Sequence, residues 1–115
     1  MVNYAPPELD RTFSALSDPT RRRILTQLLQ GKRSISELAK PHRMSLPAVM
    51  KHLDVLSDAG LIARKKTGRT VVCTLQAKPL QNTVDWLLQY RRFWEERFDR
   101  LDAYLAHVQQ GESDS

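Results

Sequence analysis

The stretch MSLPAVMKHLDVLSDAGLIARKKTGRTVVCTL, residues 44–75, decides how this chain folds. Ser45 is a favourable N-cap residue and Pro47 is tolerated in a first helical turn, so a helix is expected to begin here. Gly60 readily adopts the left-handed conformation that ends many helices. Between these two signals the apolar positions form one stripe, made of Val49, Leu53 and Leu56. The stretch therefore predicts a helix with one buried face and an open, polar leading end.

A β-hairpin is expected directly after this helix. The β-prone runs Leu61–Lys66 and Thr70–Leu75 flank the segment Thr67–Arg69, which has the composition of a hairpin turn. Strand alternation places one apolar set on a single face, namely Val71, Cys73 and Leu75. Positive charge surrounds the hairpin tip, at Arg64, Lys65, Lys66 and Arg69. We call this hairpin the wing.

Three shorter helices are expected ahead of these elements. The first carries the apolar stripe Leu9, Phe13 and Leu16. Asp18 is expected to cap the second helix, with Pro19 in its first turn and Gly31 after its end. Ser34 and Glu37 have the spacing of a capping box, which predicts a short third helix. The third and fourth helices, joined by a short turn, form a helix-turn-helix.

A long amphipathic helix is expected from Pro79. Its apolar residues follow alternating steps of four and three, interrupted only by Arg91: Leu80, Val84, Leu87, Trp94, Phe98, Leu101, Leu105 and Val108. A helix of about 30 residues, roughly 45 Å long, exceeds what a small domain can cover. We therefore expect a homodimer whose contacts are Leu9, Phe13, Leu87, Trp94, Phe98, Leu101 and Leu105. The alternative is that this helix folds back over its own core.

The length of 115 residues suits one domain, and 41% hydrophobic with 27% charged residues is ordinary for a soluble protein. The expected fold is mainly α with a small β-hairpin (α+β), a winged helix-turn-helix. Its expected parts are an arm at 1–8, a core at 9–78, a dimerisation helix at 79–110 and a disordered tail at 111–115. The sequence lacks a membrane-length apolar run and a signal-peptide layout, and it has a single cysteine, so a cytoplasmic location is expected.

The positive charge is concentrated in one part of the chain. The net charge is +5, but residues 19–69 hold 12 Lys and Arg against 3 Asp and Glu. Residues 79–115 hold 4 against 7. This asymmetry is typical of a nucleic-acid binder, and the alternative is a merely solvated basic face. The expected partner is double-stranded DNA.

In a helix-turn-helix, the leading residues of the second helix meet bases and phosphates. Here those candidates are Ser45, Leu46, Pro47, Ala48, Met50, Lys51 and His52. Ser45 and the helix N-terminus suit phosphate, and Lys51 could reach a phosphate or a guanine. The apolar candidates would meet thymine methyls or sugars. His52 has two equal interpretations, a backbone contact or a structural hydrogen bond.

The wing cations Arg64, Lys65, Lys66 and Arg69 are expected to hold phosphate or the minor groove, since four cations on one turn would otherwise repel each other. The alternative is a solvated tip. Arg21, Arg22 and Arg23 point in different directions on a helix, so at most two of them could face DNA.

The sequence gives little support for catalysis or for a metal. It contains neither a Gly-rich phosphate loop nor a serine nucleophile elbow. Its three histidines, His42, His52 and His107, form no recognisable ligand cluster with Cys73. A shared site of His107 with Asp99 or Asp102 remains the weaker alternative. We expect no catalytic residues, no metal and no cofactor.

The runs LSDPTRRRILTQLLQGKRSISELAK and MSLPAVMKHLDVLSDAGLI, followed by ARKKTGR, resemble the ArsR/SmtB family of bacterial winged-helix repressors. The resemblance covers roughly residues 9–108. It implies a homodimer that binds a pseudo-palindromic operator through the fourth helix and the wing and leaves it when an effector or oxidant is sensed.

The chain departs from the metal-sensing members at both of their ligand motifs. The third-helix C-x-C position holds Glu37–Lys40 here, and the last-helix Asp-x-His position holds Asp85–Leu87. The LAKPxxMSLPAVxKHL run and the aromatic last helix resemble the metal-independent branch, whose members are often autoregulators encoded beside a small-ligand-binding or START-like protein. Met50 stands where relatives commonly have serine.

The sequence thus predicts a dimeric DNA-binding regulator, a repressor that needs no metal. One rival is a metal- or thiol-responsive sensor with an unrecognised site. Another is a winged-helix module that docks protein and never binds DNA, although such a module would not need the clustered wing cations. The operator and any small-molecule effector stay unknown.

Overall fold

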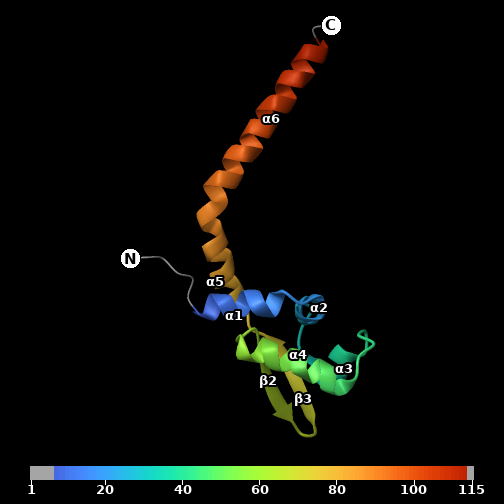
Figure 1. The fold of residues 1–115 in the computed structure, drawn as a ribbon. Coiled ribbons are helices and arrows are strands. Elements are labelled where there is room, and N and C mark those ends of the chain that lie inside the picture. The colour runs from blue at the N-terminus through green and yellow to red at the C-terminus, as the bar shows by residue number, and fades with distance from the viewer. Residues whose placement is uncertain (1–6, 114–115) are drawn as a thin grey trace. The chain divides into compact units, whose positions relative to one another are not determined.

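A computed structural model describes residues 7–113, with side chains through Gly111, and divides the chain between Thr83 and Val84 into two compact units. The first unit holds α1 (Pro7–Leu16), α2 (Pro19–Leu28), β1 (Arg33–Ser34), α3 (Ile35–Ala39), α4 (Leu46–Asp58), β2 (Ile62–Thr67) and β3 (Thr70–Leu75). Helix α5 (Lys78–Leu87) crosses the division, and the second unit continues with the 3-10 turn η1 (Leu88–Tyr90) and with α6 (Arg91–Ser113) (Figure 1). The expected fold class, mainly helical with a small antiparallel sheet, is confirmed.

The predicted helix caps of the first unit are formed. Asp18 Oδ2 accepts a backbone N–H from the first turn of α2 at 3.0 Å, and this bond lowers the pKa of the Asp18 carboxyl. Ser34 and Glu37 form the predicted capping box, with reciprocal bonds of 3.2 and 3.0 Å. Ser45 Oγ accepts the backbone N–H of Ala48 at 3.3 Å. The starts of α2, α3 and α4 therefore follow from local side-chain chemistry.

The sheet has the order β1-β3-β2 and is antiparallel throughout. The hairpin closes tightly, with Thr67 opposite Thr70 and Gly68 at φ 63°. A positive φ at Gly68 followed by a negative φ at Arg69 is the pattern of a type II′ turn, which matches the twist of the strands. The third strand, β1, was not predicted because two residues are too few to show strand alternation.

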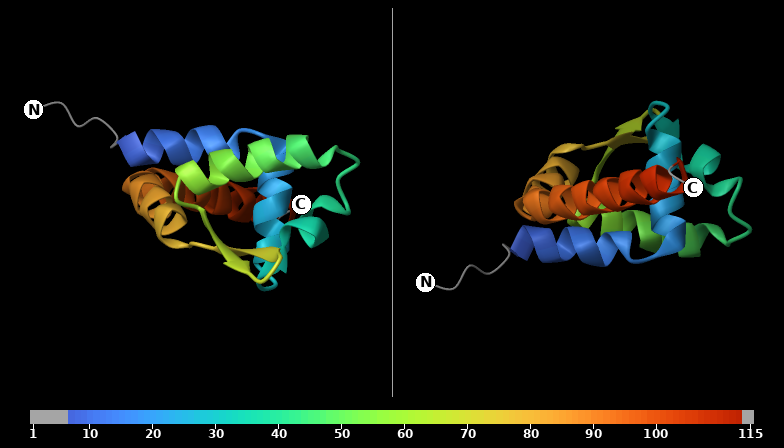
Figure 2. Two further views of the ribbon diagram at one scale, coloured as in Figure 1. Left: turned by 90° about the horizontal axis from the view of Figure 1, so that it is seen from below. Right: turned by 90° about the horizontal axis from the view of Figure 1, so that it is seen from above.

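The hydrophobic core of the first unit joins all its layers. Its buried members are Ala15, Ile24, Leu25, Leu28, Leu38, Val49, Leu53, Leu56, Leu61, Ile62 and Cys73. The predicted stripe of α4 is confirmed, since Val49, Leu53 and Leu56 are all fully buried. Helices α1 and α4 lie side by side (Figure 2). Figure 1 shows the β2–β3 hairpin beside α4, with the turn at its free end. The core thus fixes helix α4 and the wing in one unit.

The prediction of a single helix of about 30 residues from Pro79 is wrong. Helix α5 begins at Lys78, and the 3-10 turn η1 separates it from α6. A three-residue turn keeps nearly the same apolar spacing, so the heptad pattern could not reveal it. Helix α6 runs to Ser113, so residues 111–113 are helical rather than disordered. The arm predicted at 1–8 ends earlier, at the start of α1, and residues 1–6 and 114–115 lie outside the described part.

Local contacts stabilise the second unit. Trp86 and Tyr90 stack edge to face with ring centroids 5.5 Å apart, across η1. Two ion pairs with i,i+4 spacing follow, Arg91–Glu95 at 2.8 Å and Arg92–Glu96 at 3.3 Å. Such i,i+4 pairs stabilise a helix locally. In residues 7–113, no helix is both long enough and apolar enough to span a membrane.

Candidate nucleic-acid interface

The leading end of α4 is open to solvent. Ser45 satisfies one backbone N–H of the first turn, and Pro47 removes another donor, so the remaining groups can face a ligand. Leu46, directly after the cap, is 55% exposed. A helix N-terminus carries a partial positive charge that favours phosphate. The geometry and the charge of this end are therefore suited to a nucleic-acid backbone.

The seven candidates on α4 divide by exposure. The exposed members are Ser45, Leu46, Pro47 and Lys51, and the partly buried members are Ala48, Met50 and His52. Met50 packs against the core cluster, so only part of its side chain can face a ligand. Lys51 lies six residues after the cap, about 1.7 turns along the helix at 3.6 residues per turn.

The wing cations lie on two faces of the sheet. Arg64 is opposite Cys73 and Lys66 is opposite Val71, which places both cations on the face that carries the buried Cys73. Lys65 is opposite Val72 and points to the other face. Sequence spacing alone suggested four cations on one turn, whereas the strand register places Lys65 on the opposite face from Arg64 and Lys66. Arg69 lies in the turn itself, and it is exposed, as are Lys65 and Lys66.

A surface hollow of about 240 Å³ brings α4 and the wing together. Leu46 and Met50 line it from α4, and Arg69 lines it from the wing. The remaining lining comes from the start of α3 and from β3: Ser34, Ile35, Ser36, Thr70 and Val71. Two sets of candidates that are separated by about twenty residues in sequence thus border the same surface.

His52 is turned toward α2. Its Nδ1 lies 3.3 Å from Arg21 Nη1 and 3.8 Å from Asp18 Oδ2, and its side chain is 17% exposed. A guanidinium can only donate, so the Arg21 contact is a hydrogen bond in the tautomer of His52 whose Nδ1 carries no proton. Of the two interpretations of His52, this geometry favours the structural hydrogen bond.

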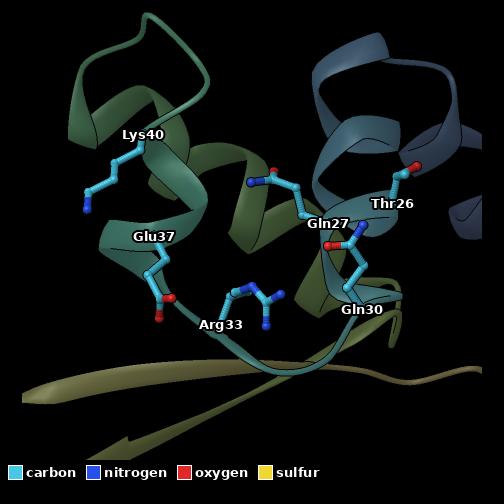
Figure 3. A pocket seen from close by; sticks show the side chains of 6 residues that line it. All are labelled: Thr26, Gln27, Gln30, Arg33, Glu37 and Lys40. Carbon is cyan, nitrogen blue, oxygen red and sulfur yellow. The ribbon is translucent and has the colours of Figure 1, made fainter.

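A second hollow, of about 390 Å³, lies between α2 and the β1–α3 segment. Figure 3 shows Thr26, Gln27 and Gln30 on one side and Arg33, Glu37 and Lys40 on the other. Glu37 already serves the capping box, and Gln27 Oε1 already accepts from His42 Nε2 at 2.8 Å. Two of the six lining side chains are therefore already engaged in structural hydrogen bonds.

Cys73 is fully buried in the core, and burial raises the pKa of its thiol. A buried thiol with a raised pKa is a poor nucleophile and a poor metal ligand. Among the residues that the structure describes, no three His, Cys, Asp or Glu side chains form a group that could hold a metal ion.

The predicted dimer contacts differ in exposure. On α6, Trp94, Phe98, Leu101 and Leu105 are 43%, 65%, 51% and 49% exposed. Phe13 on α1 is 40% exposed, and Leu87 is partly buried. Leu9 is only 5% exposed, so its side chain is already covered within one copy of the chain. The apolar row on α6 leaves four large side chains exposed that a second copy could cover.

Comparisons with known proteins agree with this architecture. The model of the family described as bacterial regulatory protein, arsR family, matches residues 18–64, from the N-cap of α2 into β2. The transcriptional repressor SdpR of Bacillus subtilis (strain 168) is 32% identical over 82 residues, which are 71% of this chain and 91% of SdpR.

Two solved structures are also similar. The protein in the crystal structure of an ArsR family transcriptional regulator has 42% sequence identity with this chain, and the two structures match with a TM-score of 0.74. The match covers 83% of this chain and 97% of that one. An ArsR-like transcriptional regulator from Rhodococcus sp. RHA1 is 34% identical with a TM-score of 0.66, and the match covers 84% and 91%.

Proposed function

The chain belongs to the ArsR family of bacterial regulatory proteins, which are DNA-binding transcriptional regulators and not enzymes, and from this premise we propose its particular mode of action. It is a homodimeric repressor of a pseudo-palindromic operator, and its own promoter is the first candidate target. It acts without a bound metal.

The observation that carries this proposal is the hollow shared by α4 and the wing. Leu46 and Met50 provide apolar contact for thymine methyls or sugars, and Arg69 provides a cation at the same surface. Ser45 and the N–H groups at the start of α4 hold a phosphate, and Lys51 reaches a second phosphate or a guanine edge. Recognition therefore depends on apolar contact and DNA shape more than on many base-specific hydrogen bonds.

The dimer is proposed to form through the apolar row of α6 together with Phe13 of α1. A two-fold axis would place two recognition helices in successive major grooves, about 34 Å apart. The exposed aromatic residues Trp94 and Phe98 support this assembly, because a monomer would leave them in water.

Metal-free action is supported by the residues at the two metal-sensing positions. Glu37–Lys40 and Asp85–Leu87 lack the cysteine and histidine ligands of those motifs. The rival is a metal- or thiol-responsive sensor. Zinc binding that lowers DNA affinity would favour its metal version, and a Cys73→Ser protein that keeps a full response would exclude its thiol version.

The other rival, a protein-docking module that never binds DNA, does not account for the wing. Lys65, Lys66 and Arg69 are all exposed near the tip of the wing, on both faces of the hairpin, and this excess of positive charge favours a polyanionic partner.

The experiment is selection of duplexes from a random pool, followed by fluorescence anisotropy. The full-length protein should enrich a two-fold symmetric duplex and bind it far more tightly than a scrambled version, with or without Zn(II) or a chelator. Binding that is abolished by zinc would support the sensor. Failure to enrich any duplex would support the docking module.

A further inference from the structure

The carboxyl end of α1 is closed by two arginines from the next helix. Arg21 Nε donates to the Ala15 carbonyl at 2.7 Å, and Arg21 Nη2 donates to the Ser14 carbonyl at 3.1 Å. Arg22 Nη1 donates to the Leu16 carbonyl at 2.7 Å. The last carbonyls of a helix have no partner within it, and its end carries partial negative charge, so guanidinium groups fit there. Two of the three arginines in the run Arg21–Arg23 therefore cap the carboxyl end of α1.

Only one of these two arginines also reaches the recognition helix. The third nitrogen of the Arg21 guanidinium, Nη1, lies 3.3 Å from His52 Nδ1 and donates to it in the tautomer whose Nδ1 carries no proton. One planar group thus joins α1 to α4. The backbone N–H of Arg21 donates to Asp18 Oδ2 at 3.0 Å, which fixes the start of the Arg21 side chain at the N-cap of α2.

The shape of the guanidinium matters for this link. Its donors lie in one plane at fixed angles, so three simultaneous bonds fix the separation and orientation of the groups that accept them. A lysine ammonium has the same charge but is a single point on a flexible stem, and it cannot span the same acceptors. His52 follows Lys51 directly, so a shift at His52 moves the neighbouring candidate contacts of α4.

We propose that Arg21 and His52 are positioning residues that set the recognition helix relative to α1, so that operator specificity depends on them although neither touches DNA. This inference rests on the proposed function. The proposal gives His52 a structural role instead of a contact with the DNA backbone. It also accounts for Arg21, the first arginine of the basic run, without a phosphate contact. Phe13 on α1 is a proposed dimer contact. The Arg21–His52 link would therefore also set the orientation of α4 relative to the proposed dimer interface.

The test measures two quantities for each full-length variant, with the selected duplex and its scrambled version as probes. The first is the specificity ratio between the two dissociation constants. The second is the slope of log affinity against log salt. For Arg21→Lys and His52→Ala we expect the ratio to fall by at least about tenfold, the equivalent of one good base contact, while the slope stays unchanged. His52→Asn should restore most of the ratio, since its side-chain oxygen can accept from Arg21.

Arg22→Ala is the matched control. It removes a bond to the same end of α1 but has no described link to α4, so it should lower thermal stability while leaving the ratio intact. Circular dichroism would verify that each variant is folded at the assay temperature.

Two outcomes would overturn the inference. Equal weakening of both duplexes, with the ratio unchanged, would mean that the side chain contacts the DNA backbone instead of positioning α4. Unchanged ratios in Arg21→Lys and His52→Ala would mean that the link does not position α4. If the wild-type protein itself fails to distinguish the duplexes, the proposed function has failed instead.

Discussion

Arg64 Nη1 lies 2.7 Å from Asp54 Oδ1, so an ion pair joins β2 of the wing to α4. Both groups are partly exposed, Arg64 at 27% and Asp54 at 58% of the side chain. A pair in this setting adds little to stability. Its main consequence is electrostatic, because Asp54 offsets one of the wing cations in the free protein.

Asp54→Asn should therefore tighten binding to any duplex by about twofold at low salt, as expected for removing one negative charge near a polyanion. The gain should be the same for the selected and the scrambled duplex and should vanish at high salt. Anisotropy titrations at two salt concentrations would measure it. Asp58→Asn, at the far end of α4, is the matched control, and an equal gain there would show that the effect is not local to Asp54.

The buried position of Cys73 predicts a slow reaction with thiol reagents. Because burial also raises the pKa of this thiol, modification by iodoacetamide should occur only as fast as the protein opens, and urea should accelerate it. Mass spectrometry over time would give the rate. Cys73→Ser should lower the free energy of unfolding by about 1–3 kcal/mol, the cost of a hydroxyl in an apolar core. Rapid modification of the native protein would revive the thiol-sensor interpretation.

His42 predicts how stability changes with pH. Burial lowers the pKa of His42 below its ordinary value of 6.5. Between the two values the unfolded chain binds a proton that the folded chain does not, so stability rises with pH. The free energy of unfolding should be highest above pH 6.5 and should fall as the pH is lowered through that value. Urea titrations across this range would measure it.

His42→Gln should remove part of this pH dependence. The His107 side chain, on α6, is the matched position, so His107→Gln should keep the full dependence. An identical pH profile for the wild-type protein and His42→Gln would contradict the assignment to His42.

The exposed row of α6 predicts the effect of a charge on assembly. Phe98 is 65% exposed, and Phe98→Glu should convert the proposed dimer to a monomer, because a carboxylate cannot be buried against an apolar row. Sedimentation equilibrium would give the mass. Arg100→Glu, two residues away on the same helix, should leave the dimer intact. A monomeric wild-type protein, or a dimeric Phe98→Glu protein, would contradict this assembly.

The accuracy of the sequence predictions depended on the range of the interactions involved. The caps at Asp18, Ser34 and Ser45 were predictable because the donors and acceptors lie within three residues of each other. The stripe of α4 was predictable because helical periodicity marks its buried face. The hairpin was predictable from its turn chemistry.

Features that depend on contacts between distant residues were missed. The Arg64–Asp54 pair and the Arg21–His52 link join residues 10 and 31 positions apart, and no local pattern records such contacts. Strand β1 exists because it pairs with β3, not because of its own sequence. In the candidate site, the start of α4 and the wing could be identified from the sequence alone. The hollow that both of them line could be found only from the fold.

The most direct test of the proposed DNA interface is a salt series of DNA affinities for the wild-type protein and for two charge variants, Lys51→Ala and the double variant Lys65→Ala with Arg69→Ala. If the start of α4 and the wing hold phosphates, the slope of log affinity against log salt should fall by about 1 for each phosphate that a variant no longer binds. We expect a decrease of about 2 for the double variant, with the fold intact. Unchanged slopes and affinities in both variants would place the DNA elsewhere and contradict the proposed interface.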